Sequence, residues 1–269
     1  MSYSNILSLI ESSIKKGNAD INSFAINLIT NIRKIISKNS LENIIINRIS
    51  KKNIYFLRHP EAQHNVLERK YRDDFSKFNI YDPELTDTGI NQMKSTIEKN
   101  KKELINFDIV FVSPLTRTIQ TFFLIKNYLN KDAQIIITDF VKEVLSYFLD
   151  KNKGKQLSVL KKEFKQENFN FEYMTKEYWW YDLGENIDNE SEGDLNFSLR
   201  LKIFILWLIF RPENNILIIS HSNVYFDLQY NGIVNAGMAK MDNNILLEKV
   251  LELNYIQINE DKSKKCNIF

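Results

Sequence analysis

Residues 53–65 read NIYFLRHPEAQHN, and this stretch begins an alternation of short apolar runs with helical patterns. Asn53–Leu57 has the character of a buried strand. Further strands are expected at Asp108–Val112, Gln134–Thr138, Ile216–Ile219 and Tyr255–Ile258. Helical periodicity predicts helices over Gly89–Leu104, Pro114–Leu129 and Phe197–Phe210. Strands that alternate with helices indicate an α/β fold, with a mostly parallel sheet and helices on both of its faces.

Polar side chains follow the predicted strands at the points where the strands end. In open α/β sheets, ligands bind beyond the carboxyl ends of the strands. We therefore expect two histidines, two arginines and a carboxylate to converge on one rim of the sheet. In chain order, these side chains are Arg58 and His59 after the first strand, Arg117 after the second, Glu143 shortly after the third, and His221 after the fourth.

The composition of this rim favours a phosphoryl group as the ligand. Two arginines offer bidentate forks for phosphate oxygens, and a helix N-terminus adds backbone donors. Ser113 is placed to cap a helix that begins at Pro114, which would put Arg117 in its first turn. A neutral imidazole such as that of His59 can attack phosphorus, and a carboxyl group such as that of Glu143 can protonate the leaving oxygen.

The sequence resembles the histidine phosphatase superfamily, in its phosphoglycerate-mutase-like branch. The resemblance covers roughly residues 53–258. One matching element would be weak evidence, but several in the family's order and spacing are strong evidence. The matching elements are Leu57-Arg58-His59-Pro60-Glu61-Ala62-Gln63-His64-Asn65, Asp82-Pro83-Glu84-Leu85-Thr86 with Gly89, Ser113-Pro114-Leu115-Thr116-Arg117-Thr118-Ile119-Gln120-Thr121, Val141-Lys142-Glu143 and Ile219-Ser220-His221-Ser222.

The resemblance implies a role for each matching residue. His59 would be the nucleophile that becomes phosphohistidine. Glu143 would donate a proton to the leaving alcohol and then accept one from the attacking water. No metal or other cofactor is implied, because the arginines and the second histidine supply the positive charge. The phosphoryl oxygens would be held, and charge in the transition state stabilised, by Arg58, Arg117 and His221, with a further hydrogen bond from Asn65.

Two departures from the family pattern bear on the expected activity. Pro60 stands where the family has Gly, which removes a backbone donor and restricts His59 to extended geometry, and we expect the site to tolerate this change. The mutases of the family carry a Glu-Arg-His-Tyr-Gly element around their acid, whereas this chain reads VKEVL at residues 141–145. The resemblance therefore implies a metal-independent phosphatase, acting on a small phosphate ester or a phosphoprotein, rather than a mutase.

Other interpretations remain open at this point. One is a phosphoglycerate-type mutase, and another is an inactive family member that binds phosphorylated partners, although the complete set of side chains argues against the second. Taken alone, His59 would be a structural histidine at a strand end. The other side chains expected at the same rim, Arg58, Arg117, Glu143 and His221, favour a catalytic role for it. Glu143 alone would be one of many carboxylates near a helix start. His64 is expected at the rim, where it would shape the pocket.

Residues 1–52 are expected to form a helical extension. An apolar stripe between Ile21 and Ile36 predicts one helix, and shorter helices are expected over residues 6–14 and 41–49. The extension would pack on the catalytic domain, and the alternative is a helix that binds a partner or makes an oligomer.

The catalytic domain is expected over residues 53–260, with residues 144–200 as an inserted cap that sets specificity. Trp179 and Trp180 would pack in a lid over the site or in the core. The acidic segment from Asp182 to Asp194 is interpreted as a solvated loop rather than a cation site.

The composition excludes several classes of protein. The chain has 269 residues, with 36 Lys and Arg against 34 Asp and Glu, and its net charge of +2 gives no electrostatic case for a nucleic-acid partner. One Cys excludes an internal disulfide framework and a Cys-rich zinc site, and three His leave little for a His-based metal site. The longest apolar run, Ile203–Phe210, is far shorter than the ~20 residues that span a bilayer. No signal peptide is visible, and we expect a cytoplasmic protein.

Residues 261–269 are expected to be a flexible basic tail, and they resemble a prenylation site. Cys266 stands in the sequence CNIF after three lysines. A terminal Phe favours geranylgeranyl, while Asn at a usually aliphatic position weakens the match. One prenyl group with the lysines would suffice for reversible membrane attachment. The alternative is a chance cysteine in a disordered tail.

Overall fold

The computed structural model describes residues 28, 30, 41–72, 74, 77, 79–145, 150–174, 176–180 and 194–251. Several expected features lie outside these residues: the strand at 255–258, the prenylation site on Cys266 with its basic tail, and nearly all of the acidic segment 182–194. The helices expected over 6–14 and 21–36 also lie outside them, apart from Leu28 and Thr30. In the part of the chain that is described, no helix has the length and apolar character needed to cross a membrane.

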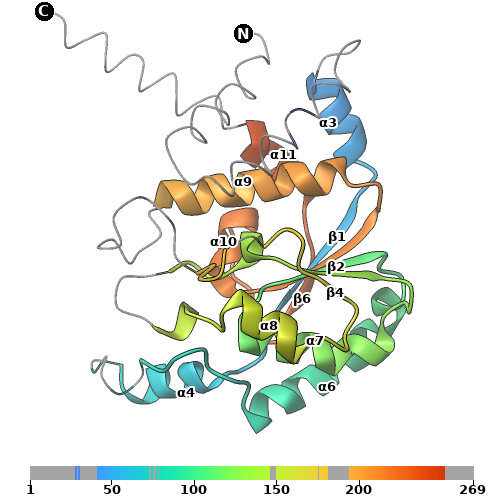
Figure 1. Cartoon of the computed structure of the whole chain (residues 1–269). Helices are drawn as coiled ribbons and strands as arrows, with labels where there is room; N and C mark the ends of the chain where they lie inside the picture. Colours follow the sequence, from blue (N-terminus) through green and yellow to red (C-terminus); the bar gives the residue numbers. More distant parts are fainter. Residues whose placement is uncertain are drawn as a thin grey trace, which may run out of the picture.

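A six-stranded sheet forms the centre of the fold, with the strand order β4-β3-β2-β5-β1-β6. Every pairing is parallel except that of β6 with β1. The predicted mostly parallel sheet, with helices on both faces, is therefore confirmed (Figure 1). The strands are β1 (Asn53–Arg58), β2 (Ile109–Val112), β3 (Gln134–Ile137), β4 (Phe169–Asn170), β5 (Asn215–Ser220) and β6 (Met238–Lys240).

Successive residues of the central strands face opposite sides of the sheet, and both sides are buried. Ile216 and Ile218 of β5 belong to one buried apolar cluster, whereas Leu217 belongs to the other. Residues of β2 alternate between the two clusters in the same way. A strand that is buried on both faces has a continuous apolar sequence, which is why these runs predict strands.

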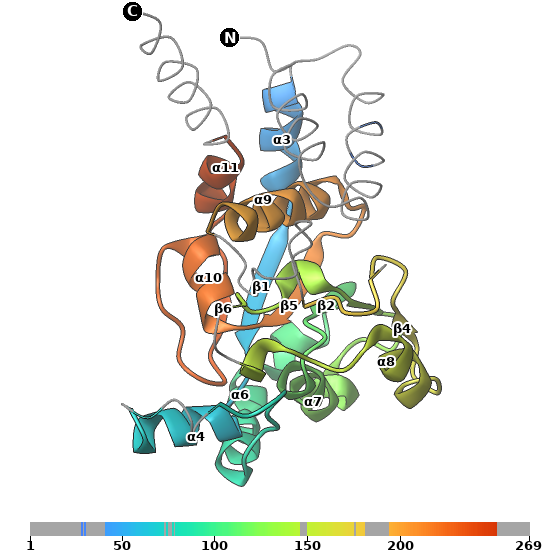
Figure 2. The same cartoon turned by 60° about the vertical axis from the view of Figure 1, so that its left-hand side comes forward.

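Helices cover both faces of the sheet (Figures 1 and 2). On one face, α9 (Asp194–Phe210) packs against α3 (Leu41–Ile49), α10 (Ser222–Gln229) and α11 (Asn243–Leu251). On the other face lie α6 (Asp87–Leu104), α7 (Thr116–Ile125) and α8 (Leu157–Glu163). Residues 201–209 of α9 are all buried, because the sheet and the other helices of its layer enclose them.

Within the described residues, the predicted elements agree with the structure to within a few positions. The helix expected over residues 41–49 is α3. The helix expected from Gly89 is α6, which begins earlier because the side chain of Thr86 caps it by accepting from the Gly89 N–H at 3.0 Å. The helix expected from Pro114 comprises α7 and a 3-10 turn, η1 (Lys126–Tyr128).

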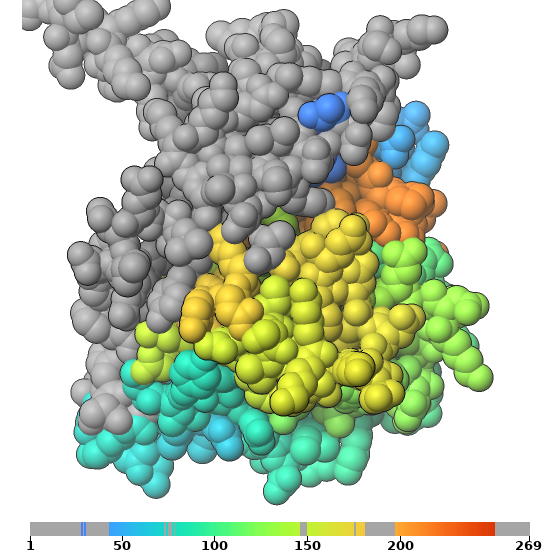
Figure 3. Space-filling view, viewed as in Figure 1, coloured from blue at the N-terminus to red at the C-terminus, as the bar shows by residue number. Residues whose placement is uncertain are grey.

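Residues 144–200 contribute α8 and β4 to this architecture, together with the short turn η3 (Asp150–Asn152). In the space-filling view, the yellow surface of this segment lies beside the green surface that precedes it in the chain (Figure 3). Trp179 and Trp180 are buried in the cluster on the α7 face, so they belong to the core.

We expect Phe204→Ala to lower the free energy of unfolding by about 3–5 kcal/mol, because it removes a fully buried ring and leaves a cavity. That ring lies edge-on to Phe111 of the sheet, with centroids 5.2 Å apart. Val159→Ala on the exposed side of α8 is the control, and should change stability by less than about 0.5 kcal/mol. Equilibrium unfolding in urea measures both, and equal effects would contradict the assigned core.

Candidate active site

The carboxyl ends of three strands meet because β5 lies between β1 and β2. The parallel register places Arg58 opposite Ser220. It also places Val112 opposite Ile219. The residues that come next are neighbours in space, as the sequence predicts for one rim of the sheet. They are His59 after β1, Ser113 after β2 and His221 after β5.

His59 is a buried imidazole with one nitrogen available for chemistry. Its side chain is 2% exposed, and its ring centroid lies 5.2 Å from that of His221. Nδ1 of His59 lies 2.7 Å from the carbonyl oxygen of Pro60. A carbonyl only accepts, so Nδ1 carries the proton and Nε2 keeps a lone pair. Burial lowers the pKa of His59 well below its usual value, and the charge of Arg117 lowers it further, so the ring is neutral.

Pro60 contributes its carbonyl group to this arrangement, and proline retains that group. The atom that fixes the tautomer of His59 is an oxygen, so the missing N–H of Pro60 has no consequence there. The N–H of His59 donates to the carbonyl of Ser220 at 3.0 Å, which continues the pairing of β1 with β5 beyond the last strand residue. The expected tolerance of proline at this position therefore has a physical reason.

Arg117 is a buried cation whose guanidinium group is held from one side. Its side chain is 1% exposed and projects from the first turn of α7. Nη1 of Arg117 donates to the carbonyl of Lys151 at 2.8 Å, and Nη2 donates to Oδ1 of Asn152 at 2.9 Å. Burial lowers the pKa of Arg117 to about 10, so the group is still charged at neutral pH. Sequence reasoning missed both partners, because a backbone carbonyl and a lone amide side chain form no motif.

The start of α7 corrects one prediction. Ser113 does not cap a helix beginning at Pro114, because α7 begins at Thr116. Asp82 satisfies this helix end instead: its Oδ1 accepts from the N–H of Thr116 at 2.9 Å, and its Oδ2 accepts from the Thr116 hydroxyl at 2.7 Å. The hydroxyl of Ser113 lies 2.8 Å from Nε2 of His221, so this serine serves the site rather than the helix.

His221 and Arg58 lie on the same rim as His59. The side chain of His221 is fully buried at the start of α10, and burial lowers its pKa well below the usual value. Nη1 of Arg58 donates to the carbonyl of Ile233 at 2.7 Å, in the loop between α10 and β6. This bond anchors the guanidinium group of Arg58 at one nitrogen and leaves the other nitrogens for a ligand.

Glu143 is the carboxyl group of the rim. It is 9% exposed, and its Oε1 accepts from the N–H of Val144 at 2.9 Å. Burial raises the pKa of Glu143, although backbone N–H donors and the charge of Arg117 oppose the shift. A carboxyl group with a raised pKa keeps its proton at a higher pH than an exposed one, as a general acid requires. Arg200 of α9 holds the preceding segment by donating to the backbone carbonyls of Asp139, Phe140 and Lys142.

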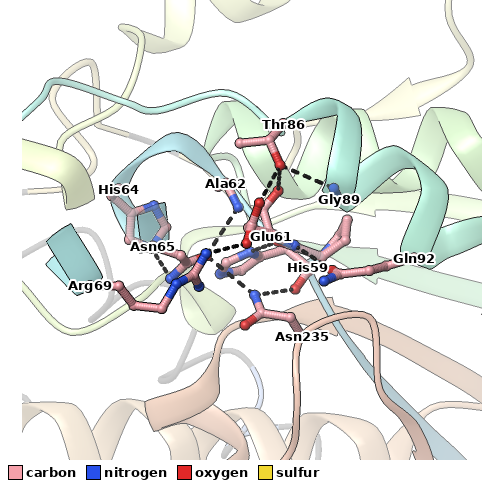
Figure 4. A network of polar contacts seen from close by, with 11 residues as sticks. His59, Glu61, Ala62, His64, Asn65, Arg69, Thr86, Gly89, Gln92 and Asn235 are labelled. Carbon is pink, nitrogen blue, oxygen red and sulfur yellow. Dashed lines mark hydrogen bonds and ion pairs between the residues drawn. The ribbon is translucent and has the colours of Figure 1, made fainter. Parts of the chain in front are cut away.

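Asn65 lies near His59 on α4 (Gln63–Lys70), and its amide is held on both sides (Figure 4). Its Oδ1 accepts from the N–H of Ala62 at 3.0 Å and from Nδ2 of Asn235 at 3.2 Å. Its Nδ2 lies 3.0 Å from Nε2 of His64. An amide nitrogen carries two hydrogens, so one remains for the ligand contact that the family resemblance implies. Sequence reasoning missed Asn235, which lies far away in the chain.

The loop after β1 is fixed by close packing against α6 (Figure 4). A Cβ atom at Gly89 would lie 2.1 Å from the carbonyl oxygen of Glu61, so only glycine allows this approach. The carboxylate of Glu61 accepts from the Thr86 hydroxyl at 2.8 Å and pairs with Arg69. The element with Thr86 and Gly89, recognised in the sequence by resemblance, thus acts by holding the loop that follows the nucleophile.

Four buried side-chain nitrogens in this cluster have no hydrogen-bond partner among the described residues. The two arginine nitrogens are donors, and an unpaired buried donor costs about 1–3 kcal/mol, so their position here indicates a ligand that offers acceptors. A phosphoryl group offers several acceptor oxygens and a negative charge that suits guanidinium groups. Over the same described residues, no group of three or more His, Cys, Asp or Glu side chains is placed to hold a metal ion. The four nitrogens are Nε of Arg58, Nδ1 of His64, Nε of Arg117 and Nδ1 of His221.

A family model described as the histidine phosphatase superfamily (branch 1) matches residues 54–264. The chain belongs to this superfamily. Apart from Asn53 at the start of β1, the match covers all the strands of the described sheet and all the rim residues, so the resemblance found in the sequence is confirmed.

Solved structures of several phosphatases are similar to this chain. The ecdysone phosphate phosphatase from Bombix mori, in complex with tungstate, is 13% identical, with a TM-score of 0.50 over 71% of this chain and 89% of that one. A phosphoserine phosphatase from Entamoeba histolytica, in complex with 3-phosphoglyceric acid, is 19% identical, with a TM-score of 0.41 over 70% and 89%. A mycobacterial glucosyl-3-phosphoglycerate phosphatase is 13% identical, with a TM-score of 0.44 over 70% and 90%. At 13% identity, the likeness to the ecdysone phosphate phosphatase concerns the fold alone. No curated protein matches the sequence.

We expect all three histidines of this histidine phosphatase chain to stay neutral between about pH 7.5 and 5.5, a window in which an exposed histidine with a pKa of about 6.5 titrates. Burial is the main cause of each lowered pKa. Because the unfolded chain binds these protons below about pH 6.5 and the folded chain does not, the contribution to stability is present above that pH and is lost as the pH falls. Ring ¹⁵N and ¹³C shifts measure the titration, and a histidine titrating near pH 6.5 would contradict the described burial.

We expect Asn152→Ala to weaken the binding of inorganic phosphate about tenfold, because a hydrogen bond to a charged group contributes about 1.5–3 kcal/mol. The substitution removes the acceptor that orients Nη2 of Arg117 and the donor to the Val144 carbonyl at 2.7 Å. Asn91→Ala on the exposed side of α6 is the matched control. Isothermal titration calorimetry measures the affinity of both variants. Wild-type affinity in the Asn152 variant would show that its hydrogen bond to Arg117 does not orient Arg117 for a ligand.

Proposed function

We propose that the chain is a metal-independent phosphatase that hydrolyses a phosphomonoester through a phosphohistidine on His59. The observation that carries this proposal is the protonation of His59: the Pro60 carbonyl holds the proton on Nδ1, so Nε2 of a buried, neutral ring is free to attack. Membership of the histidine phosphatase superfamily supports the same reaction. The substrate would be a small phosphorylated molecule or a phosphoprotein.

In the first half of the reaction, the lone pair on Nε2 of His59 forms a bond to phosphorus, and the bond from phosphorus to the leaving oxygen breaks. The protonated carboxyl group of Glu143 gives its proton to that oxygen, so the product leaves as a neutral alcohol. The transferred group is bound by Arg58, Arg117 and His221, which stabilise the charge on its oxygens.

In the second half, a water molecule attacks phosphorus and the phosphorus–nitrogen bond breaks. The carboxylate of Glu143 accepts a proton from the water, which restores the protonated acid, and the electron pair of the broken bond returns to Nε2 of His59. The products are inorganic phosphate and the free enzyme. The raised pKa of Glu143 suits both directions of proton transfer, because it lies closer to neutral pH than the pKa of an exposed carboxyl group.

The contacts of Lys142, which precedes Glu143, favour hydrolysis over transfer of the phosphoryl group back to a substrate that carries a carboxylate. Lys142 is 2% exposed, and its Nζ donates to the carbonyl of Trp180 at 3.1 Å. This cation therefore supports the backbone beneath the site instead of facing a substrate. A phosphoglycerate-type mutase would need other cations for the substrate carboxylate.

We expect the purified full chain to hydrolyse para-nitrophenyl phosphate in the presence of a chelator, and His59→Ala to abolish the turnover. The exposed Lys94→Ala substitution on α6 is the control and should leave the rate unchanged. With 3-phosphoglycerate as substrate, free phosphate supports a hydrolase, whereas an isomerised product identifies a mutase. Full activity in the His59 variant would exclude the proposed mechanism.

We expect Glu143→Gln to lower the turnover of an alkyl phosphate by about 10²–10⁴-fold, as for other general acids. The loss should be smaller for para-nitrophenyl phosphate, because nitrophenolate leaves without being protonated. Initial rates with the two substrates at the same pH measure the difference. An unchanged rate with the alkyl phosphate would show that another group supplies the proton.

A further inference from the structure

His64 is a second buried imidazole beside His59, and the proposed chemistry does not use it. It lies in the first turn of α4, with 5% of its surface exposed, and is therefore about as buried as the other histidines of the rim. Its ring centroid is 5.7 Å from that of His59. Buried imidazoles ordinarily have hydrogen-bond partners at both nitrogens, yet Nδ1 of His64 has none among the described residues.

The amide of Asn65 decides which nitrogen of His64 carries the proton (Figure 4). The N–H of Ala62 donates to one amide atom of Asn65 at 3.0 Å, so that atom is the oxygen. The amide nitrogen of Asn235 donates to the same oxygen at 3.2 Å. It also donates to the carbonyl of His59 at 3.4 Å, which fixes the orientation of Asn235 in turn. The nitrogen of the Asn65 amide therefore faces His64.

An amide nitrogen can only donate, so Nε2 of His64, which lies 3.0 Å from Nδ2 of Asn65, is the acceptor. The single proton of the neutral ring is consequently on Nδ1. Burial and the charge of Arg117 lower the pKa of His64 well below its usual value, which keeps a second proton off the ring. His64 thus presents one fixed N–H that points away from Asn65.

We propose that His64 is a substrate-binding residue, and that its Nδ1–H donates a hydrogen bond to an oxygen of the phosphoryl group held next to His59. The inference deepens the proposed function and rests on it. Arg117 and Arg58 act on that group through their charge, whereas His64 is a neutral donor and adds direction. The N-terminal cap of α4 and the substrate then belong to one chain of hydrogen bonds, from Ala62 through Asn65 and His64.

The first test observes His64 in the wild-type chain by ¹⁵N NMR of the histidine rings, with inorganic phosphate as the probe. We expect the free protein to show the Nδ1–H tautomer of His64, and saturating phosphate to shift that proton downfield and slow its exchange with water. A proton on Nε2 in the free protein would overturn the inference. Phosphate that binds but leaves the Nδ1–H signal unmoved would overturn it as well.

The second test compares two substitutions by the inhibition constant of inorganic vanadate. His64→Phe keeps a ring but no donor, and should weaken vanadate about three- to tenfold, as loss of one neutral hydrogen bond predicts. His64→Asn keeps an N–H near the position of Nδ1 and should retain most of the affinity. Equal affinity of the Phe variant and the wild type would overturn the inference.

The outcomes separate this inference from the function on which it rests. A wild-type chain that neither binds phosphate nor hydrolyses para-nitrophenyl phosphate would overturn the proposed function together with the inference. Hydrolysis that depends on His59, combined with a His64 signal insensitive to phosphate, would overturn the role of His64 alone. If His64→Phe does not fold, the NMR measurement on the wild type decides.

Discussion

The position of β5 between β1 and β2 is the constraint on which the site depends. Parallel pairing with both neighbours sets Arg58 opposite Ser220 and Val112 opposite Ile219, so the residues that follow all three strands emerge at one edge. A shift of one residue in either pairing would turn each side chain of the strand to the other face of the sheet, where the close packing of the other cluster fits a different side chain. The apolar packing on both faces therefore fixes the geometry of polar groups that contribute little to the core themselves.

Burial lowers the pKa of both kinds of group at this edge, but it removes the charge of only one kind. It keeps the imidazoles neutral, which preserves the lone pair of His59 as a nucleophile. Arg117 stays charged with a pKa of about 10, and its hydrogen bonds go to a carbonyl and an amide rather than to a carboxylate, although Asp82 and Glu143 attract it from farther away. The positive charge is thus available to an anionic ligand in a region where water screens it weakly. A neutral nucleophile beside a buried cation that has no carboxylate as a hydrogen-bond partner is an arrangement that suits attack on a phosphate ester.

The sequence alone predicts the central strands, because strands buried on both faces are continuous apolar runs, and it predicts the rim residues, because they follow those strands. It does not predict β4 or β6, because these strands are very short. It also does not predict η3 with Asn152, because a single amide side chain that accepts from Arg117 forms no motif. The predicted start of α7 is wrong for a related reason. Asp82, which lies far away in the chain, supplies the cap that we expected from Ser113. Asn235 was missed because its contacts with Asn65 and His59 join distant segments. Local patterns predict elements and strand ends, whereas supports between distant segments appear only in the folded chain.

The proposed reaction depends on a covalent bond between Nε2 of His59 and phosphorus. The most direct measurement is to quench the full chain during turnover of a ³²P-labelled phosphomonoester, digest it under alkaline conditions that preserve phosphohistidine, and locate the label by mass spectrometry. We expect label on His59 at Nε2, because the Pro60 carbonyl occupies the hydrogen-bonding position of Nδ1. Label at Nδ1, label on another residue, or turnover without any labelled protein would contradict it.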